Sequence, residues 1–416
     1  MTHILNFAHS LADRYYQEGV QYEERGAVDE AMAAFQRAIR ASGTHAPARL
    51  ALAYHYRRLD RLDKALSHCN AALAHEASAE AYFLLGHILI AKEQFPAALD
   101  ALHRCLELDP NFDRARYQIA FIYYLRGEYE VAITEFHRAA QHECEWETLF
   151  FLGECYRMTR RPAEAERVLR RALCLTSNWT QIELTRGQLF ACQRLAEFPP
   201  DHVLTPKDRA YCDSGVVYLG TGADDGIAIP PYLFHNFTYA DVAQTLRRLL
   251  ALKEAEGWHW DAVQPVDIVS LPLALALAEH LGIGTEPRRH GTTLVVQALG
   301  ETMEGMQDAM EGLADARSFC LMVCWSEEWR PDLVGIATPL VGSLPWYRTS
   351  AIPRLYASLL EREAELTVSQ KPSWLDPRSP ELIAADILAA LKVPPPDPNL
   401  QTQLDYYRQH PRLRWR

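Results

Sequence analysis

The sequence lacks an apolar run long enough to cross a membrane. Its longest candidate, Ile268 to Leu277, is interrupted by Ser270 and Pro272, whereas a spanning helix needs about 20 predominantly apolar residues. Residues 1–6 also place no basic segment ahead of an apolar one, as a secretory signal would. We therefore expect a cytoplasmic protein with no membrane partner.

Motifs for disulfides and metals are lacking too. The nine cysteines are odd in number, and none forms a CxxC pair. His235, His259, His280 and His290 show no ligand spacing to one another or to cysteine. We expect reduced thiols, no metal site and no cofactor.

Excess positive charge is absent as well, because the formal net charge is −12. This balance argues against general nucleic-acid binding. A length of 416 residues, with 49% apolar and 23% charged residues, indicates a globular protein of two or three domains. The composition does not indicate an oligomeric state.

What the sequence does contain is a repeat between Asp13 and Thr176. Small residues recur at steps of 34, 33, 34 and 33 residues, at Ala31, Ala65, Ala98, Ala132 and Ala165. A second set of small residues precedes them: Gly19, Ala53, Gly86, Ala120 and Gly153. Apolar residues flank both sets, so each unit is expected to be a helical hairpin whose two helices approach closely at the small residues.

This pattern resembles the tetratricopeptide repeat (TPR) family, most closely at Tyr82, Leu85, Gly86, Ala98 and the terminal Leu108-Asp109-Pro110. The resemblance implies a five-hairpin solenoid over residues 1–178, because one hairpin alone cannot bury its apolar face. Residues 179–205 are expected to form a capping helix, Trp179 to Glu197, and a linker.

In this family the first helices of the hairpins line a concave groove, which implies a peptide or helix as partner. Aromatic rings supply buried area there and arginines fix acidic groups. The alternative for any single ring is packing between hairpins. The family's lysine and asparagine pair for a peptide carboxylate is replaced by Tyr16 and Val20. The candidate groove residues are Tyr16, Tyr54, Arg57, Arg58, Phe83, His87, Tyr117, Phe121, Tyr124, Phe150, Glu154 and Arg157.

After residue 205 short β-branched runs alternate with helical stretches, which predicts a three-layer α/β domain with a mainly parallel sheet over residues 206–393. A Pro-rich link and a basic aromatic tail follow over residues 394–416. The expected strands are Gly215–Leu219, Val266–Ser270, Thr292–Gln297, Phe319–Trp325 and Leu333–Ala337. The expected helices are Tyr239–Glu256, Leu273–Leu281, Glu301–Ala316, Ala351–Glu365 and one from Ser379 to Leu391.

A glycine-rich segment follows the first expected strand, with Gly220, Gly222, Asp224 and Asp225. Glycines after a strand bring backbone amides close to a phosphate when a helix follows. Here the residues that follow include Pro230 and do not open a helix, so an ordinary surface loop is the alternative.

Val266 to Gly282, followed by Thr293 to Gly305, resembles the pyrophosphate-side strand and the signature strand, loop and helix of type I phosphoribosyltransferases. The resemblance covers Gly215 to Ala337. That family has two adjacent acidic residues where this chain has Gln297 and Ala298, and its phosphate loop is not acidic, whereas this one carries Glu301 and Glu304. We therefore expect the domain to have lost that activity.

Two hypotheses remain. The first is a protein-interaction adaptor whose α/β module binds or senses a ligand without catalysis. The alternative is a divergent phosphoribosyl or nucleotide-handling transferase, with Asp224, Asp225 and Thr302 at its site and the repeats presenting its substrate. The tail, with Tyr406, Tyr407 and several arginines, suits RNA or an acidic partner, docking onto the protein, or disorder.

Overall fold

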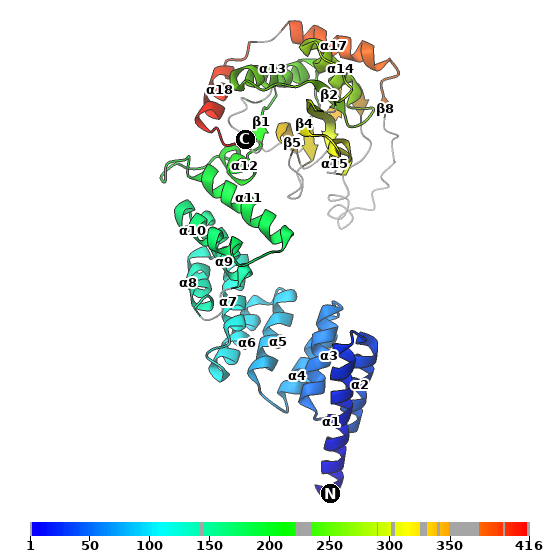
Figure 1. Cartoon of the computed structure of the whole chain (residues 1–416), viewed down its shortest axis with the longest axis vertical. Coiled ribbons are helices and arrows are strands. Elements are labelled where there is room, and N and C mark those ends of the chain that lie inside the picture. Colours follow the sequence, from blue (N-terminus) through cyan, green and yellow to red (C-terminus); the bar gives the residue numbers. More distant parts are fainter. Residues whose placement is uncertain are drawn as a thin grey trace, which may run out of the picture. The chain divides into compact units, whose positions relative to one another are not determined.

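The computed structural model describes residues 2–141, 145–221, 224, 235–288, 290–300, 304–324, 331–338, 342–348, 374–393 and 396–413. The chain forms two compact units, residues 1–192 and 193–416 (Figure 1). Each unit has its own buried apolar clusters. Within the described residues no helix combines the length and the apolar character that a bilayer crossing requires.

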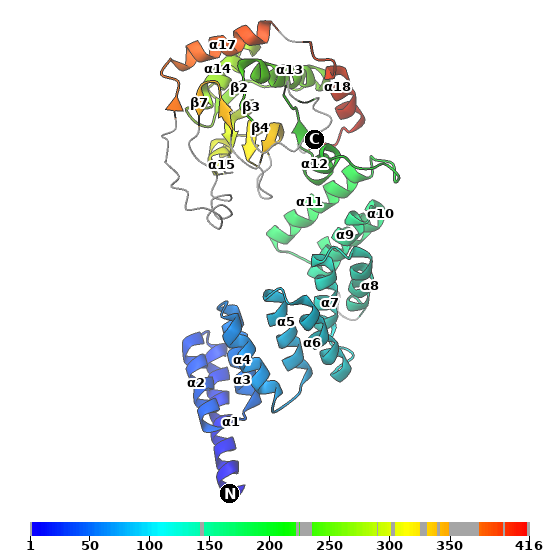
Figure 2. The same ribbon diagram turned by 180° about the vertical axis from the view of Figure 1, so that it is seen from behind.

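The described residues of the first unit form five helical hairpins and one further helix, so the predicted helical repeats are confirmed (Figures 1 and 2). The two helices of each hairpin contact each other, and each second helix contacts the first helix of the next hairpin. The helices are α1 (Thr2–Glu24), α2 (Val28–Ala41), α3 (Ala46–Arg58), α4 (Leu62–Leu73), α5 (Ala79–Ala91), α6 (Phe95–Leu108), α7 (Asp113–Leu125), α8 (Tyr129–Ala139), α9 (Trp146–Met158), α10 (Pro162–Leu173) and α11 (Trp179–Leu195).

Small residues set the spacing inside each hairpin. The five anchor alanines, Ala31, Ala65, Ala98, Ala132 and Ala165, are all 0% exposed. A Cβ atom added to a crossing glycine would lie 2.4 Å from a ring atom of Phe35 at Gly19, 2.7 Å from Leu102 Cγ at Gly86 and 2.6 Å from Leu169 Cγ at Gly153. These distances are shorter than van der Waals contact, so only glycine permits this approach.

Each hairpin turn contains one residue with positive φ, five residues before the anchor alanine. These residues are Gly26, Asp60, Glu93, Gly127 and Arg160, with φ between 55° and 73°. A residue with a Cβ in this region is strained by roughly 1 kcal/mol. The turn therefore repeats with the same period as the core, although three of the five positions are not glycine.

The first helices of the hairpins form one continuous row. α3 contacts α5, α5 contacts α7, and α7 contacts α9, whereas no pair of second helices in the described residues makes comparable contact. The first helices are thus closer together than the second helices, as expected for the inner side of a curved stack. We call the surface formed by α1, α3, α5, α7 and α9 the first-helix surface.

The second unit is built on a five-stranded sheet in which every neighbouring pair is parallel, so the predicted parallel sheet is confirmed. The strand order is β1-β5-β4-β3-β2, and a separate three-stranded sheet has the order β6-β7-β8. The strands are β1 (Val217–Tyr218), β2 (Ala262–Pro265), β3 (Thr292–Gly300), β4 (Asp315–Cys324), β5 (Leu333–Thr338), β6 (Ser343–Leu344), β7 (Tyr347–Arg348) and β8 (Trp374–Leu375).

Helix α17 packs against both α13 and α14, and α14 contacts β2 and β3 (Figure 1). Capping boxes begin α12 at Thr205 and α13 at Thr238, which satisfies the first free amides of both helices. The predicted third layer of the domain stays a prediction. The helices are α12 (Pro206–Ser214), α13 (Tyr239–Glu256), α14 (Leu271–Leu281), α15 (Glu304–Met310), α17 (Pro380–Lys392) and α18 (Leu400–Gln409).

Two predicted elements are shifted in the structure. The strand expected at Val266–Ser270 is instead β2, which ends at Pro265, because the Asp267 carboxylate accepts hydrogen bonds from the amide and hydroxyl of Ser270 and closes a turn. The helix expected at Glu301–Ala316 ends at Met310, since Gly312 has φ 79° and β4 begins at Asp315. The helix expected at Ala351–Glu365 lies outside the described residues.

The C-terminal segment docks onto β1, which is an edge strand of the sheet. The hydroxyl of Tyr407 donates to the carbonyl of Tyr218 (3.0 Å) and accepts from its amide (2.8 Å). Gln403 donates to the carbonyl of Leu219 (2.8 Å). Side chains thus satisfy the free backbone groups of an edge strand, which otherwise promote pairing with other chains.

The crossing glycines allow a test in which two glycine-to-alanine changes have opposite effects on stability. Gly153→Ala places a methyl group against Leu169, and such overpacking should lower the free energy of unfolding by about 1–3 kcal/mol. The matched change Gly187→Ala lies on α11, where no atom lies within 4 Å of the added Cβ, so it should raise stability by about 0.5–1 kcal/mol. Urea denaturation measures the free energy of unfolding of both variants. If both changes shifted it equally and in the same direction, the packing described here would be contradicted.

Candidate functional site

All twelve predicted groove residues lie on the first helices of the hairpins, from α1 to α9. Their exposure differs along the row. Phe83 and Phe150 are each 8% exposed and act mainly in packing between hairpins. Tyr54 is 45% exposed and Arg58 is exposed. The other eight are half-buried: Tyr16, Arg57, His87, Tyr117, Phe121, Tyr124, Glu154 and Arg157.

The second hairpin presents an exposed aromatic ring with cations beside it. The guanidinium carbons of Arg57 and Arg58 lie 5.9 Å and 6.0 Å from the ring centre of Tyr54. This distance is within the range of cation–π attraction, about 6 Å. The arginines therefore hold the ring on the first-helix surface, where it is accessible to a partner.

Arg57 also connects this hairpin to the next one. Its Nη1 donates to Nε2 of His87 on α5 at 3.2 Å. Burial, followed by the positive charges of Arg57 and Arg114, lowers the pKa of His87 from 6.5 to about 4. His87 is therefore neutral near pH 7 and accepts a hydrogen bond between two repeats.

The fourth and fifth hairpins share an aromatic cluster. Tyr117, Phe121 and Tyr124 on α7 surround Phe151 on α9, with ring-centre separations of 6.4, 5.1 and 5.1 Å. Phe151 was not among the predicted residues, although the repeat register marks it as the neighbour of Phe150. These rings pack between repeats and also border the first-helix surface.

A hydrogen-bonded chain of polar groups continues the row to α11. Tyr124 donates to Glu154 (2.8 Å), Gln188 donates to the same carboxylate (2.8 Å), and Arg157 donates to Gln188 (2.9 Å). Burial and the charge of Glu154 raise the pKa of Tyr124. Gln188 was missed because α11 departs from the repeat pattern, so no register position identifies it.

A pocket of about 210 Å³ opens among the third, fourth and fifth hairpins, and we call it the repeat pocket. Three predicted residues line it: Phe83, His87 and Tyr117. The sequence prediction missed its polar residues, because the pocket forms where the amino ends of α7 and α9 meet α5. Those polar residues are Asp113, Arg114, Gln118, Glu145, Glu147 and Thr148, and Ala139 completes the lining.

In the second unit, the described part of the predicted glycine loop is tied down by ion pairs. Gly220 has φ 74°, and an added Cβ would lie 2.0 Å from Oδ1 of Asp224. The Asp224 side chain is 2% exposed and lies 3.8 Å from Nη1 of Arg248, whose Nε also donates to Asp397 at 2.7 Å. Gly222, Asp225 and Thr302, the other predicted loop residues, lie outside the described residues.

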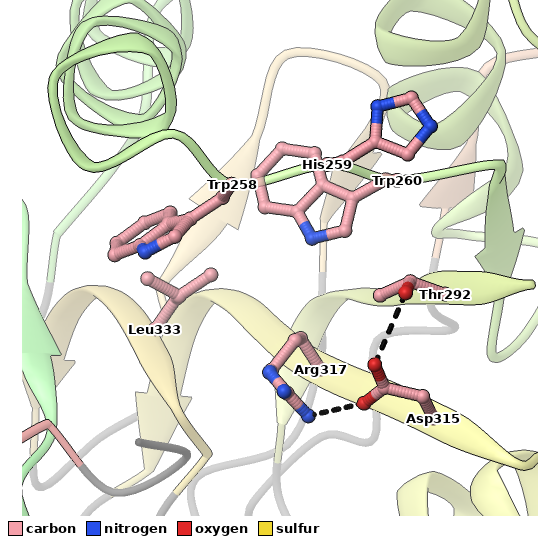
Figure 3. A pocket seen from close by; sticks show the side chains of 7 residues that line it. All are labelled: Trp258, His259, Trp260, Thr292, Asp315, Arg317 and Leu333. Atoms are coloured by element: carbon pink, nitrogen blue, oxygen red, sulfur yellow. Dashed lines mark hydrogen bonds and ion pairs between the residues drawn. The ribbon is translucent and has the colours of Figure 1, made fainter.

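Another pocket, of about 220 Å³, lies where β3, β4 and β5 begin, and we call it the amino-edge pocket (Figure 3). The Trp258 and Trp260 rings line one side and Arg317 the other. Arg317 is paired with Asp315 at 2.7 Å, and Asp315 accepts from Thr292 at 3.0 Å. Ligands in parallel sheets usually bind at the opposite, carboxyl ends of the strands.

The depressed pKa of His87 predicts a pH effect on stability. His87 takes up a proton near pH 6.5 in the unfolded chain but only near pH 4 in the folded chain. The free energy of unfolding should therefore fall as the pH decreases from 6.5 to 4. His87→Gln should reduce the fall, and His75→Gln, in an exposed turn, should leave it unchanged. Urea denaturation between pH 6.5 and 4 measures this loss of stability in each variant. If His87→Gln lost as much stability as the wild type, the assigned role of His87 would be contradicted.

Comparison with solved structures gives several similar proteins, and the three named here each cover less than half of this chain. MamA is 24% identical, over 37% of this chain and 92% of that chain, with a TM-score of 0.35. TTC0263, a thermophilic TPR protein in Thermus thermophilus, is 22% identical, over 43% and 98%, with a TM-score of 0.37. YrrB, described as a TPR protein with an unusual peptide-binding site, is 19% identical, over 41% and 90%, with a TM-score of 0.35.

A search of curated proteins gave no match. The comparisons give no support to the predicted resemblance of residues 215–337 to type I phosphoribosyltransferases, which stays a prediction. Family models described as tetratricopeptide repeat match residues 23–88, 79–112 and 148–181. Residues 23–112 and 148–181 of this chain are therefore tetratricopeptide repeats.

Proposed function

We propose that the chain is a protein-interaction adaptor that binds a peptide or a helix of another protein along its first-helix surface. The observation that carries the proposal is the placement of Tyr54 and Arg58. Because the Tyr54 ring is 45% exposed and lies beside guanidinium groups, its burial adds little to the stability of the fold. Tyrosine and arginine side chains, however, often supply most of the binding energy at protein interfaces.

The partly exposed residues of the other hairpins extend this surface over several repeats. An extended or helical peptide spanning the row contacts side chains on successive first helices. Because α5 contacts α7 and α7 contacts α9, these side chains are held on a preformed surface. Preformed surfaces lose little conformational entropy on binding, which suits capture of a flexible segment.

For the second unit, the proposal is a module that binds or senses a ligand without catalysis. The support is the commitment of Asp224, the one described acidic residue of the candidate catalytic set, to an internal ion pair with Arg248. A carboxylate that is 2% exposed and paired is not available to a substrate or a metal. No described contact favours the transferase alternative.

The adaptor proposal is tested with the full chain immobilised against cell extract and the captured proteins quantified by mass spectrometry. Tyr54→Ala combined with Arg58→Glu should reduce capture of specific partners by about tenfold or more, as expected for interface residues of this type. Leu108→Ala combined with Val131→Ala changes two exposed residues on second helices and should leave capture unchanged. An identical set of captured proteins for the wild type and the first variant would sink the proposal.

The second unit is tested by thermal shift of the full chain with nucleotides, or with phosphoribosyl pyrophosphate and magnesium, alongside an assay for turnover. A ligand of the module should raise the melting temperature in a saturable way and should not be consumed. Turnover that disappears in Asp224→Asn would favour the transferase and overturn the proposal for this unit.

A further inference from the structure

The repeat pocket differs from the rest of the first-helix surface in its charge. Asp113, Glu145 and Glu147 line it with a single cationic side chain, Arg114. The guanidinium carbon of Arg114 lies 4.8 Å from the ring centre of Phe83. In the described residues neither Glu145 nor Glu147 makes a side-chain hydrogen bond or ion pair, so the pocket retains an excess of negative charge.

Two further observations concern the polar groups of the pocket. The Oδ1 atom of Asp113 is buried and has no hydrogen-bond partner in the described residues, an arrangement that costs free energy unless a donor is supplied. Burial, followed by the charges of Glu147 and Glu145, raises the pKa of Tyr117, which lies in the aromatic wall. The two glutamates therefore act on the same space that Tyr117 lines.

The walls and the size define the occupant further. Phe83 and Tyr117 form an apolar aromatic side, which suits the methylene stem of a long side chain, while the carboxylates suit its charged end. A volume of about 210 Å³ is below the roughly 300–1,000 Å³ of pockets for drug-sized ligands. The space fits one side chain better than a separate small molecule.

We infer that the repeat pocket is the specificity site of the adaptor and takes a lysine or arginine side chain of the bound peptide. This inference rests on the proposed function. The basic group lies among Asp113, Glu145 and Glu147, and its stem packs against Phe83 and Tyr117. The charge of the site is opposite to that required for a peptide carboxylate.

The test begins with selection of short peptides from a random library on the immobilised full chain. The selected peptides should share one lysine or arginine. The most enriched peptide is then compared with its Lys→Gln or Arg→Gln form, on the wild type and on Glu145→Gln combined with Glu147→Gln. Each change alone should weaken binding about tenfold, the size expected of a partly buried charge pair, and both together should weaken it little further.

A matched control removes two carboxylates elsewhere. Glu76→Gln combined with Asp100→Asn changes two exposed positions, in the turn after α4 and on α6, and should leave peptide affinity unchanged. Thermal melting establishes that each variant is folded. If selected peptides share no basic residue, or if the two losses simply add, the inference is wrong while the adaptor proposal stands. If the selection enriches no peptide, the adaptor proposal fails and the inference with it.

Discussion

The close approach of two helices at one small residue per hairpin is the contact on which the first unit depends. Gly19, Gly86 and Gly153 each leave room for a side chain of the second helix, and an added Cβ would lie less than 3 Å from it. Because this approach sets the separation within a hairpin, it also sets how far apart successive first helices lie. The geometry of the first-helix surface therefore follows from the packing of each first helix against its second helix.

Polar pairs between successive first helices follow from the same spacing. His55 lies beside Glu23, Arg57 donates to His87 and Tyr124 donates to Glu154, over sequence separations of 32, 30 and 30 residues. Each pair thus joins equivalent sides of neighbouring repeats. Side chains in these pairs have a structural role and also border the binding surface, so truncating them disturbs both. Tyr54 and Arg58 are more exposed, and changes there separate binding from stability more cleanly.

The sequence predicted the repeats well, because small residues spaced by 33 or 34 positions have few structural explanations other than nested hairpins. It also predicted α13 at its observed bounds and the parallel sheet. It did not predict the repeat pocket, whose carboxylates lie at the amino ends of α7 and α9, where the repeat pattern specifies no residue type. Nor did it predict the partners of Arg248, because Asp224 and Asp397 lie in other segments, and Asp397 is 149 positions after Arg248 in the sequence.

The composition of the C-terminal tail left three alternatives open: binding of RNA or an acidic partner, docking onto the protein, and disorder. Tyr406 and Tyr407, beside several arginines, resemble a stacking surface for RNA bases. In the structure Nζ of the buried Lys207 lies 4.5 Å and 4.6 Å from their ring centres, and Tyr407 is 1% exposed. The hydroxyl of Tyr407 accepts from the amide of Tyr218 and donates to its carbonyl. The Tyr407 ring, whose hydroxyl closes the sheet edge and whose surface is covered, offers no face to a base, so Tyr407 serves the fold of the second unit.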